Sequence, residues 1–144
     1  MKKSYWIVGG LFILESSCII EYETATKFVI QNESSVQVKI FISHFLKDYH
    51  TLDTTFVLDP DSQIDHIYYL DGKNAVYPHP FGPGSDSAQL IFDDRLSTTY
   101  TLYDSVPRNI LHFENYNGGE LDKSIFEFYY IIKESDYQNA SEFR

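Results

Sequence analysis

Hydrophobic and polar residues alternate along most of the chain with the period of two that is typical of β-strands. The clearest case is residues 36–46, in which valine and isoleucine at every second position share one face while polar residues occupy the other. A second run rich in β-branched and aromatic residues, 24–30, precedes it across the polar break 31–35. We therefore predict that the two runs pair as a β-hairpin.

Six further segments have strand-forming composition and are separated by turn-forming residues. We predict strands at 54–58, 64–70, 88–93, 98–103, 110–116 and 124–133. The last of these is apolar on both faces, which predicts a central strand that is buried on both sides. Residues 134–143 form a polar tail, for which we predict one short helix packed by Tyr137.

Eight short strands separated by turns at short intervals are typical of an antiparallel β-sandwich. We therefore predict an all-β fold, immunoglobulin-like in outline, with a small barrel as the alternative. No helical pattern alternates with the strands, so a parallel α/β sheet is not expected. Hydrophobic residues make up 43% of the chain, which is enough apolar surface to favour a folded domain over disorder. Residues 24–144 are interpreted as one such domain.

The N-terminal residues follow a different pattern. Lys2 and Lys3 precede the apolar stretch 5–14, and Ser16-Ser17 lead to Cys18, which is the one cysteine of the chain. Positive charge, a short apolar segment and small residues in this order are the features of a cleavable secretory signal. Ten residues in a helix would cover only about half of a ~30 Å hydrocarbon core. We therefore predict a signal peptide at 1–17 and no transmembrane anchor.

The end of this segment, Ser16-Ser17-Cys18, resembles the lipobox of bacterial lipoproteins, in which the cysteine thiol is acylated. Glu15 stands where that motif ordinarily has an aliphatic residue. The resemblance implies that residues 18–23 are a lipidated N-terminus and short tether, with diacylglycerol and palmitate chains carried by Cys18. The alternative for Cys18 is a buried thiol that packs as a small hydrophobic side chain.

Short stretches of the remaining chain are similar to a group of small Bacteroidetes lipoproteins that have no assigned activity. They are Phe28-Val-Ile-Gln-Asn-Glu-Ser, Pro80-Phe-Gly, Ser85-Asp-Ser, Leu90-Ile-Phe-Asp-Asp, Arg108-Asn-Ile-Leu, Tyr129-Tyr-Ile and Glu134-Ser-Asp-Tyr. The resemblance implies a protein of β fold in the cell envelope, anchored on the periplasmic or the surface side of the bacterial outer membrane. It assigns no catalytic residue.

The charge of the chain limits the partners that we expect. There are 21 acidic and 11 basic residues, which give a net charge of −10. Nucleic acid would be repelled, and no basic stripe interleaved with aromatic residues is present. Anionic lipid headgroups would be repelled as well, so membrane association has to come from the lipid anchor. No hydrolase, metalloprotease or nucleotide-binding motif occurs, and we expect neither enzymatic activity nor a cofactor.

Candidate metal ligands are scattered along the sequence. Asp59, Asp61 and Asp65 have the spacing of the first ligands of a calcium loop, but Ile64 and Leu70 stand where an EF-hand needs glycine and glutamate. This favours a polar turn. We predict no metal site, because the histidines lack the short, fixed spacings of zinc ligands. They are interpreted as separate, partly exposed residues: His44, His50, His66, His79 and His112.

The densest cluster of proline and glycine is the loop 77–86, which carries Tyr77, His79 and Phe81. Long ordered loops often hold binding residues, and exposed aromatic rings stack on sugars or anchor a partner protein. We therefore name these three as candidate ligand-binding residues, the alternative being that Tyr77 and Phe81 fold back onto the core. Two functions follow. The first is a membrane-anchored envelope protein that binds another protein or joins an envelope complex, and the alternative is a module that binds carbohydrate or another small ligand with this loop.

Overall fold

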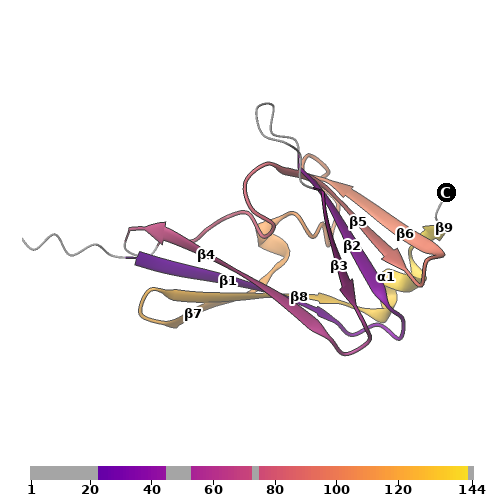
Figure 1. The fold of residues 1–144 in the computed structure, drawn as a ribbon, viewed down its shortest axis with the longest axis horizontal. Coiled ribbons are helices and arrows are strands. Elements are labelled where there is room, and N and C mark those ends of the chain that lie inside the picture. Colours follow the sequence, from indigo (N-terminus) through magenta and orange to yellow (C-terminus); the bar gives the residue numbers. More distant parts are fainter. Residues whose placement is uncertain (1–22, 45–52, 73–74, 143–144) are drawn as a thin grey trace, which may run out of the picture.

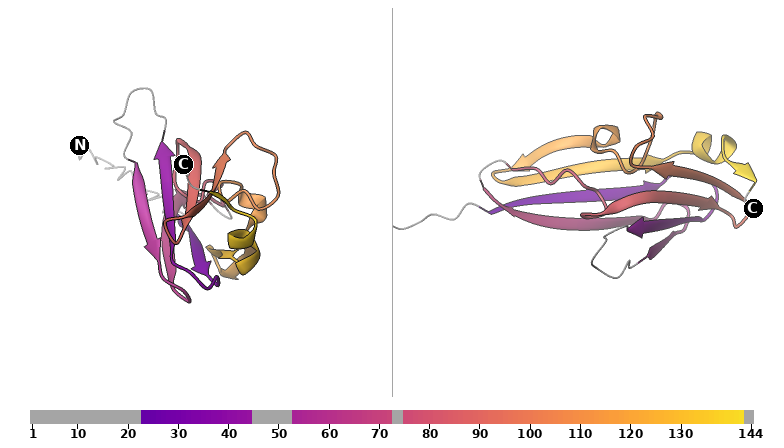
Figure 2. Two further views of the ribbon diagram at one scale, coloured as in Figure 1. Left: turned by 90° about the vertical axis from the view of Figure 1, so that its right-hand side faces the viewer. Right: turned by 90° about the horizontal axis from the view of Figure 1, so that it is seen from above.

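Two β-sheets pack face to face in a computed structural model that describes residues 23–44, 53–72 and 75–142 (Figure 1). One short α-helix and one 3₁₀-helix are the only helical elements of these ranges. The predicted all-β sandwich is confirmed, and the two separate sheets distinguish it from a closed barrel. The sandwich is elongated along its strands, and β9 lies at the end far from the first residues of β1 (Figure 2).

The first sheet has the strand order β4-β1-β8-β7 and the second has the order β3-β2-β5-β6-β9. The strands of the first sheet are β1 (Glu23–Asn32), β4 (Gln63–Asp71), β7 (Asn117–Asp122) and β8 (Ile125–Ile132). Those of the second are β2 (Val38–His44), β3 (Thr54–Leu58), β5 (Ser85–Phe92), β6 (Leu96–Thr101) and β9 (Ser141–Glu142). The helical elements are η1 (Phe113–Asn115) and α1 (Glu134–Gln138). Neighbouring strands are antiparallel except β1 and β8, which run parallel.

The core lies between the sheets and follows directly from the alternation in the sequence. On β2, Val38, Ile40 and Ile42 are fully buried, while the residues between them are only partly buried. On β1, Phe28 faces the same core, and its ring lies 5.4 Å from Tyr116 and 6.0 Å from Phe128. Full burial of side chains of this size contributes roughly 1.5–3 kcal/mol each. Apolar burial at every second position is thus what holds the sheets together.

β1 and β2 belong to different sheets, so the predicted hairpin of 24–30 with 36–46 is wrong. The segment between the two strands carries the chain from one sheet to the other. Its conformation is fixed by Asn32, whose side chain is fully buried. Its amide group donates hydrogen bonds to the carbonyl oxygens of Val36 (2.9 Å) and Leu58 (3.1 Å). Its side-chain oxygen accepts from the backbone N–H of Ser34 (3.0 Å). These local bonds fix a corner in place of a tight hairpin turn.

Residues 110–116 form turns and η1, so the strand predicted there is wrong as well. Ile110 and Leu111 are both buried although they are adjacent, which an extended strand with one buried face does not allow. The side chain of Asn109 holds this turn, because its oxygen accepts from the backbone N–H of Leu111 at 3.0 Å. Residues 117–119, which follow the predicted strand, begin the edge strand β7.

The other predicted strands correspond to β3, β4, β5 and β6, with ends that differ by at most three residues. β8 lies between β1 and β7, as expected of a central strand. Its burial on both sides was predicted wrongly, because Ile125 and Tyr129 on the outer face are 42% and 38% exposed. The predicted helix of the tail is α1, and Tyr137 on it packs against Phe92 with ring centres 5.8 Å apart.

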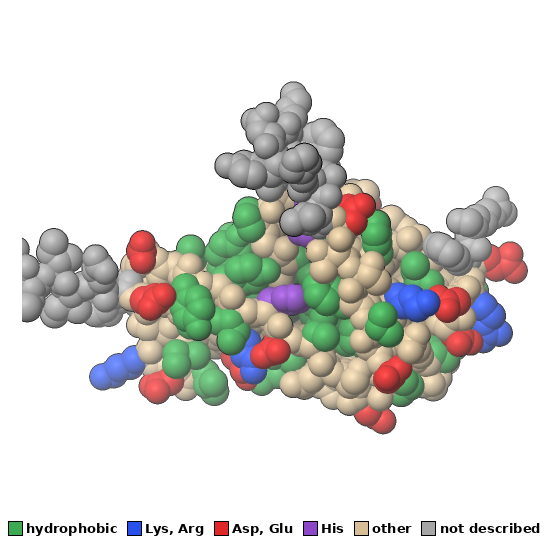
Figure 3. Space-filling model, viewed as in Figure 1, with side chains coloured by type: hydrophobic (Ala, Val, Ile, Leu, Met, Phe, Trp, Pro, Cys, Tyr) green, Lys and Arg blue, Asp and Glu red, His purple; other side chains and the backbone are tan. Residues whose placement is uncertain are grey.

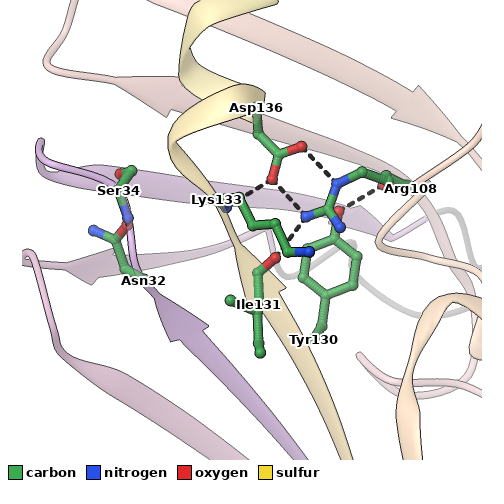
Figure 4. A network of polar contacts seen from close by, with 7 residues as sticks. All are labelled: Asn32, Ser34, Arg108, Tyr130, Ile131, Lys133 and Asp136. Atoms are coloured by element: carbon green, nitrogen blue, oxygen red, sulfur yellow. Dashed lines mark hydrogen bonds and ion pairs between the residues drawn. The ribbon is translucent and has the colours of Figure 1, made fainter.

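Arg108 joins α1 to β8 at one end of the sandwich (Figure 4). Its guanidinium group donates through Nε (2.6 Å) and Nη2 (2.5 Å) to the carboxylate of Asp136, and Nη2 also donates to the carbonyl oxygen of Ile131 at 2.5 Å. The guanidinium carbon lies 5.1 Å from the ring centre of Tyr130, whose hydroxyl donates back to the carbonyl oxygen of Arg108 at 2.6 Å. One side chain thus connects the helix, the strand and an aromatic ring of the core.

Candidate functional site

A cavity of about 330 Å³ lies between the two sheets where their edge strands β3 and β4 approach each other. It is partly open to solvent and is lined by two residues each from β2, β3 and β4 and one from the loop before β5: Ile42, His44, Thr54, Phe56, His66, Tyr68 and Phe81. On the face of the molecule seen in Figure 3, histidine side chains lie among hydrophobic ones. The combination of aromatic walls with a few polar groups is typical of small-ligand sites.

The lining follows from strand periodicity. On each of the three strands the two lining residues are separated by one residue, which places both side chains on the inner face. On β4, His66 and Tyr68 are partly buried, while Ile67 and Tyr69 beside them are exposed. β4 is an edge strand, so its inner face has a neighbour on one side only. The cavity therefore forms where the packing between the sheets ends.

His44, the last residue of β2, is the first histidine of the cavity wall. Its Nε2 lies 3.2 Å from the carbonyl oxygen of Phe81, and because a carbonyl oxygen only accepts, Nε2 must carry the hydrogen. The other ring nitrogen of His44 is Nδ1. It is buried and has no hydrogen-bond partner within the described part of the chain. A buried polar atom in this state costs about 1–3 kcal/mol.

His66 is the second histidine of the cavity wall. Its ring packs edge-on against Phe56 (5.0 Å between ring centres) and Phe81 (6.0 Å). This burial lowers the pKa of His66, and the negative charge of Asp65 opposes the shift in part. The imidazole is accordingly neutral at pH 7. Its Nε2 is also buried without a hydrogen-bond partner among the described residues.

Tyr68 closes the wall beside the histidines. Its hydroxyl donates to the carbonyl oxygen of Pro80 at 3.3 Å, and its ring stacks on Tyr77 with centres 4.4 Å apart. Burial, with a smaller effect of Tyr77, raises the pKa of Tyr68 to about 12, so the phenol stays neutral. None of the seven lining residues is aspartate, glutamate, lysine or arginine.

The three candidate loop residues lie in different surroundings. Phe81 is only 7% exposed, belongs to the hydrophobic core and lines the cavity. Tyr77 is partly buried on Tyr68, and its backbone N–H donates to Thr26 Oγ1 at 3.0 Å. His79 is exposed and contacts Tyr77 edge-on at 5.8 Å between ring centres. Two of the three rings therefore fold back onto the sandwich, and only Phe81 reaches the cavity.

The histidines of the cavity were interpreted as separate residues in the sequence, and the structure brings two of them together. His44 and His66 are 22 positions apart and lie on strands of different sheets, so no local spacing connects them. One signal was present, because His66 alternates with Ile64 and Tyr68 on the apolar face of its strand. This pattern already indicates a side chain that points inward.

Several earlier predictions concern other parts of the chain. Cys18, the signal peptide 1–17 and His50 lie outside the described residues. Within the described ranges, no group of three or more histidine, cysteine or acidic side chains is arranged to hold a metal ion. In the same ranges, no helix has the length and hydrophobicity needed to cross a membrane.

A second notable surface is the outer face of the sheet formed by β4, β1 and β8. Four large hydrophobic side chains are exposed on it by 38% to 63%: Ile67, Tyr69, Ile125 and Tyr129. Between them, Lys27 forms ion pairs with Glu127 (3.1 Å) and Asp65 (3.6 Å). The strand register places these residues in adjacent rows, since Ala25 of β1 stands between Tyr69 of β4 and Ile125 of β8. The face is thus apolar around one charged cluster.

Comparisons of the chain with protein families, with curated proteins and with solved structures found no match.

Proposed function

We propose that this chain is an exported cell-envelope lipoprotein, anchored through acylated Cys18, whose β-sandwich binds a small molecule in the cavity between β2, β3 and β4. One observation carries the binding function: the cavity brings together the side chains of His44 and His66, from strands of different sheets, within walls that are largely aromatic. A few polar groups among aromatic walls are typical of small-ligand sites, which supports a ligand site here.

The size and composition of the cavity support the same function. Its volume of about 330 Å³ is at the lower end of the range that holds small organic ligands, which is about 300–1,000 Å³. Three of the lining residues are aromatic apart from histidine, namely Phe56, Tyr68 and Phe81, and they provide the apolar contact area that such ligands need. The site therefore combines shape with a small number of directional groups.

A substitution that fills the cavity tests the binding function. In the full chain, Phe56→Trp adds a larger ring at the cavity wall and should abolish binding of any compound found by ligand-observed NMR in a library of small uncharged molecules. Val57→Trp is the matched control, because Val57 is the next residue of β3 and its side chain is 54% exposed on the opposite face. Compounds that bind both variants equally well, or no binding compound at all, would contradict the proposal.

The anchor is supported by the order of charged, apolar and small residues before Cys18. Two or three acyl chains at about 0.8 kcal/mol per buried methylene would give stable membrane attachment. Cys18→Ala should therefore move the protein from the detergent phase to the aqueous phase in a phase-partition experiment. Unchanged partitioning would remove lipidation from the proposed function.

Binding of an envelope protein is the second candidate function, and the exposed apolar face of β4, β1 and β8 favours it. Patches of this kind on a soluble domain often mark interaction sites. Cross-linking in intact envelopes should capture a partner that is lost in Tyr69→Glu, because Tyr69 is 63% exposed on that face. The matched control is Tyr103→Glu, since Tyr103 is 87% exposed and lies outside both sheets. A partner captured equally by both variants would exclude this face.

A further inference from the structure

We infer that the end of the sandwich at which β1 begins rests on the surface of a zwitterionic lipid bilayer, with Tyr69, Leu121 and Ile125 in the lipid interface. This inference rests on the proposed anchoring through Cys18 and adds the orientation of the domain on the membrane. Three observations lead to it: the exposed hydrophobic side chains at this end, the short chain between Cys18 and β1, and the charge of the neighbouring segments.

The three hydrophobic residues come from strands that begin or stop at the same end of the first sheet. In the strand register, Ala25 of β1 stands between Tyr69 of β4 and Ile125 of β8. The backbone N–H of Ala25 also donates to the carbonyl oxygen of Ser124 at 2.8 Å, which fixes the hairpin of β7 and β8 beside the start of β1. Leu121 lies at the tip of that hairpin. At this end of the molecule, hydrophobic side chains lie among charged ones (Figure 3).

Two of the three side chains are among the most exposed hydrophobic residues of the domain. Leu121 is 68% and Tyr69 is 63% exposed, and among the large hydrophobic side chains of the described residues only Tyr103 is more exposed. The register of β7 and β8 shifts at Leu121, which therefore stands opposite no residue of β8. Packing within the sheet thus gives no reason for a leucine here. In the boundary between lipid headgroups and acyl chains, leucine and tyrosine are both favourable.

The chain between the acylated cysteine and the first strand is short. Five peptide units separate Cys18 from Glu23, the first residue of β1, and they span at most about 18 Å when fully extended. β1 itself has ten residues and extends over roughly 33 Å, at about 3.3 Å per residue. Because the acyl chains hold Cys18 at the membrane surface, the start of β1 remains close to the bilayer, whereas its other end can be distant.

The anchor makes an otherwise weak contact effective. Three partly exposed side chains bury too little apolar surface to hold a free domain on a membrane. Anchoring turns their contact with lipid into an intramolecular step, for which a short linker provides a high effective concentration. The contact therefore follows from anchoring and orients the domain without replacing the anchor.

The charge of this end determines the kind of lipid surface. The segments 19–23, 71–74 and 120–123 include the start of β1 and the last residues of β4 and β7, and they carry five acidic and two basic residues. Anionic headgroups would repel this end, through an interaction that salt screens. Zwitterionic headgroups such as phosphatidylcholine have no net charge, so the apolar side chains can enter the interface without this repulsion.

The first test places one fluorophore at the hairpin tip of the acylated chain. Trp6 is the one tryptophan of the sequence and lies in the predicted signal peptide, so the mature chain has none. Leu121→Trp in phosphatidylcholine vesicles should show a blue-shifted emission, and it should lose emission when the lipid is brominated. Val57→Trp is the matched control, because Val57 is 54% exposed and its neighbour Leu58 pairs with Val38, beyond the far end of β1. Its emission should not change.

A second measurement reports on the native side chains. In the anchored, unmodified chain, a nitroxide on the lipid headgroup should broaden the methyl NMR signals of Leu121 and Ile125 and leave those of Val57 unchanged. Leu121→Asp should reduce the broadening at Ile125, whereas Val57→Asp should not. Phosphatidylglycerol in place of phosphatidylcholine should reduce it strongly at about 0.01 M salt and less at about 1 M, because the Debye length falls from about 30 Å to about 3 Å.

The outcomes distinguish the orientation of the domain from the anchor. Equal quenching of Leu121→Trp and Val57→Trp, no quenching of either in acylated protein, or a stronger contact on phosphatidylglycerol would overturn the inference and leave the anchor in place. A blue shift of Leu121→Trp that brominated lipid does not quench would assign this end to a contact with a second copy of the chain instead. Mass spectrometry that finds Cys18 without acyl chains would remove the proposed anchor and this inference with it.

Discussion

The contact between Arg108 and Asp136 offers the sharpest test of how the end of the sandwich is held. In Arg108→Ala, three hydrogen bonds of 2.5–2.6 Å disappear, two to the carboxylate of Asp136 and one to the carbonyl oxygen of Ile131. The carboxylate is only 11% exposed, so solvent replaces the lost donors poorly. The backbone N–H of Lys133, at 2.8 Å, remains as its donor.

The expected decrease in the free energy of unfolding follows from the exposed fractions of the two side chains. Hydrogen bonds to a charged partner contribute about 1.5–3 kcal/mol each. Here they share one guanidinium group that is 36% exposed and therefore screened in part, so we expect about 3 kcal/mol in total. For a domain of this size that loss corresponds to a decrease of the melting temperature by about 10 °C. Urea denaturation should show a lower midpoint with an unchanged slope, since the surface exposed on unfolding is the same.

A double-mutant cycle isolates the pair from other effects of the substitutions. Arg108→Ala, Asp136→Ala and the double variant should give a coupling free energy of about 1.5–2 kcal/mol. The matched control is the pair Arg95 and Asp93, which forms the same kind of contact at 2.7 Å but is 67% and 50% exposed. Exposed pairs give about 0–1 kcal/mol. Equal coupling in the two pairs would refute the reasoning that burial strengthens this contact.

Two further predictions concern the cavity wall and the edge of the first sheet. Burial lowers the pKa of His66 in the folded state. As the pH falls, this histidine is therefore protonated in the unfolded chain before it is protonated in the folded chain. Because proton binding then favours the unfolded chain, the free energy of unfolding should decrease as the pH falls below about 6.5. The decrease, measured by urea denaturation from pH 7.5 to 5.5, should be smaller in His66→Gln, and identical pH profiles would contradict this. Gly118→Ala should destabilise the chain by more than about 2 kcal/mol, because at φ +152° a Cβ atom would collide with the backbone carbonyl oxygen of Glu127. Gly119→Ala, whose Cβ would have no neighbour within 4 Å, should change the melting temperature little, and similar losses in the two variants would argue against the clash.

The strands were largely predictable because their signal is local. The alternation in 36–46 directly encodes the buried face of β2, and Tyr137 indicated the packing of α1. The failures occur where side chains bond to the backbone nearby. Asn109 holds 110–116 in turns although the residues have strand propensity, and Asn32 forms a corner where a hairpin was expected. The strand propensity of a segment gives no information about hydrogen bonds between a side chain and the nearby backbone.

The cavity shows the limit of sequence patterns most clearly. The loop 77–86 was selected for its prolines and aromatic rings, yet only Phe81 reaches the site. The remaining wall comes from three strands that the sequence marks as ordinary core. His44 and His66 carry the polar chemistry, and neither has a neighbour in sequence that suggests a ligand. Candidate residues on loops are easily noticed, whereas those on inner strand faces are not.

Composition and periodicity were thus sufficient for the all-β class and for most strand positions, since the burial of every second residue is a property of each segment alone. Which strands are neighbours, and on which sheet each lies, depends on contacts between residues that are far apart in the chain. The cavity arises from that arrangement, because it exists only where the edge strands β3 and β4 of opposite sheets meet. Two histidines become one site through sheet packing, which no local pattern encodes.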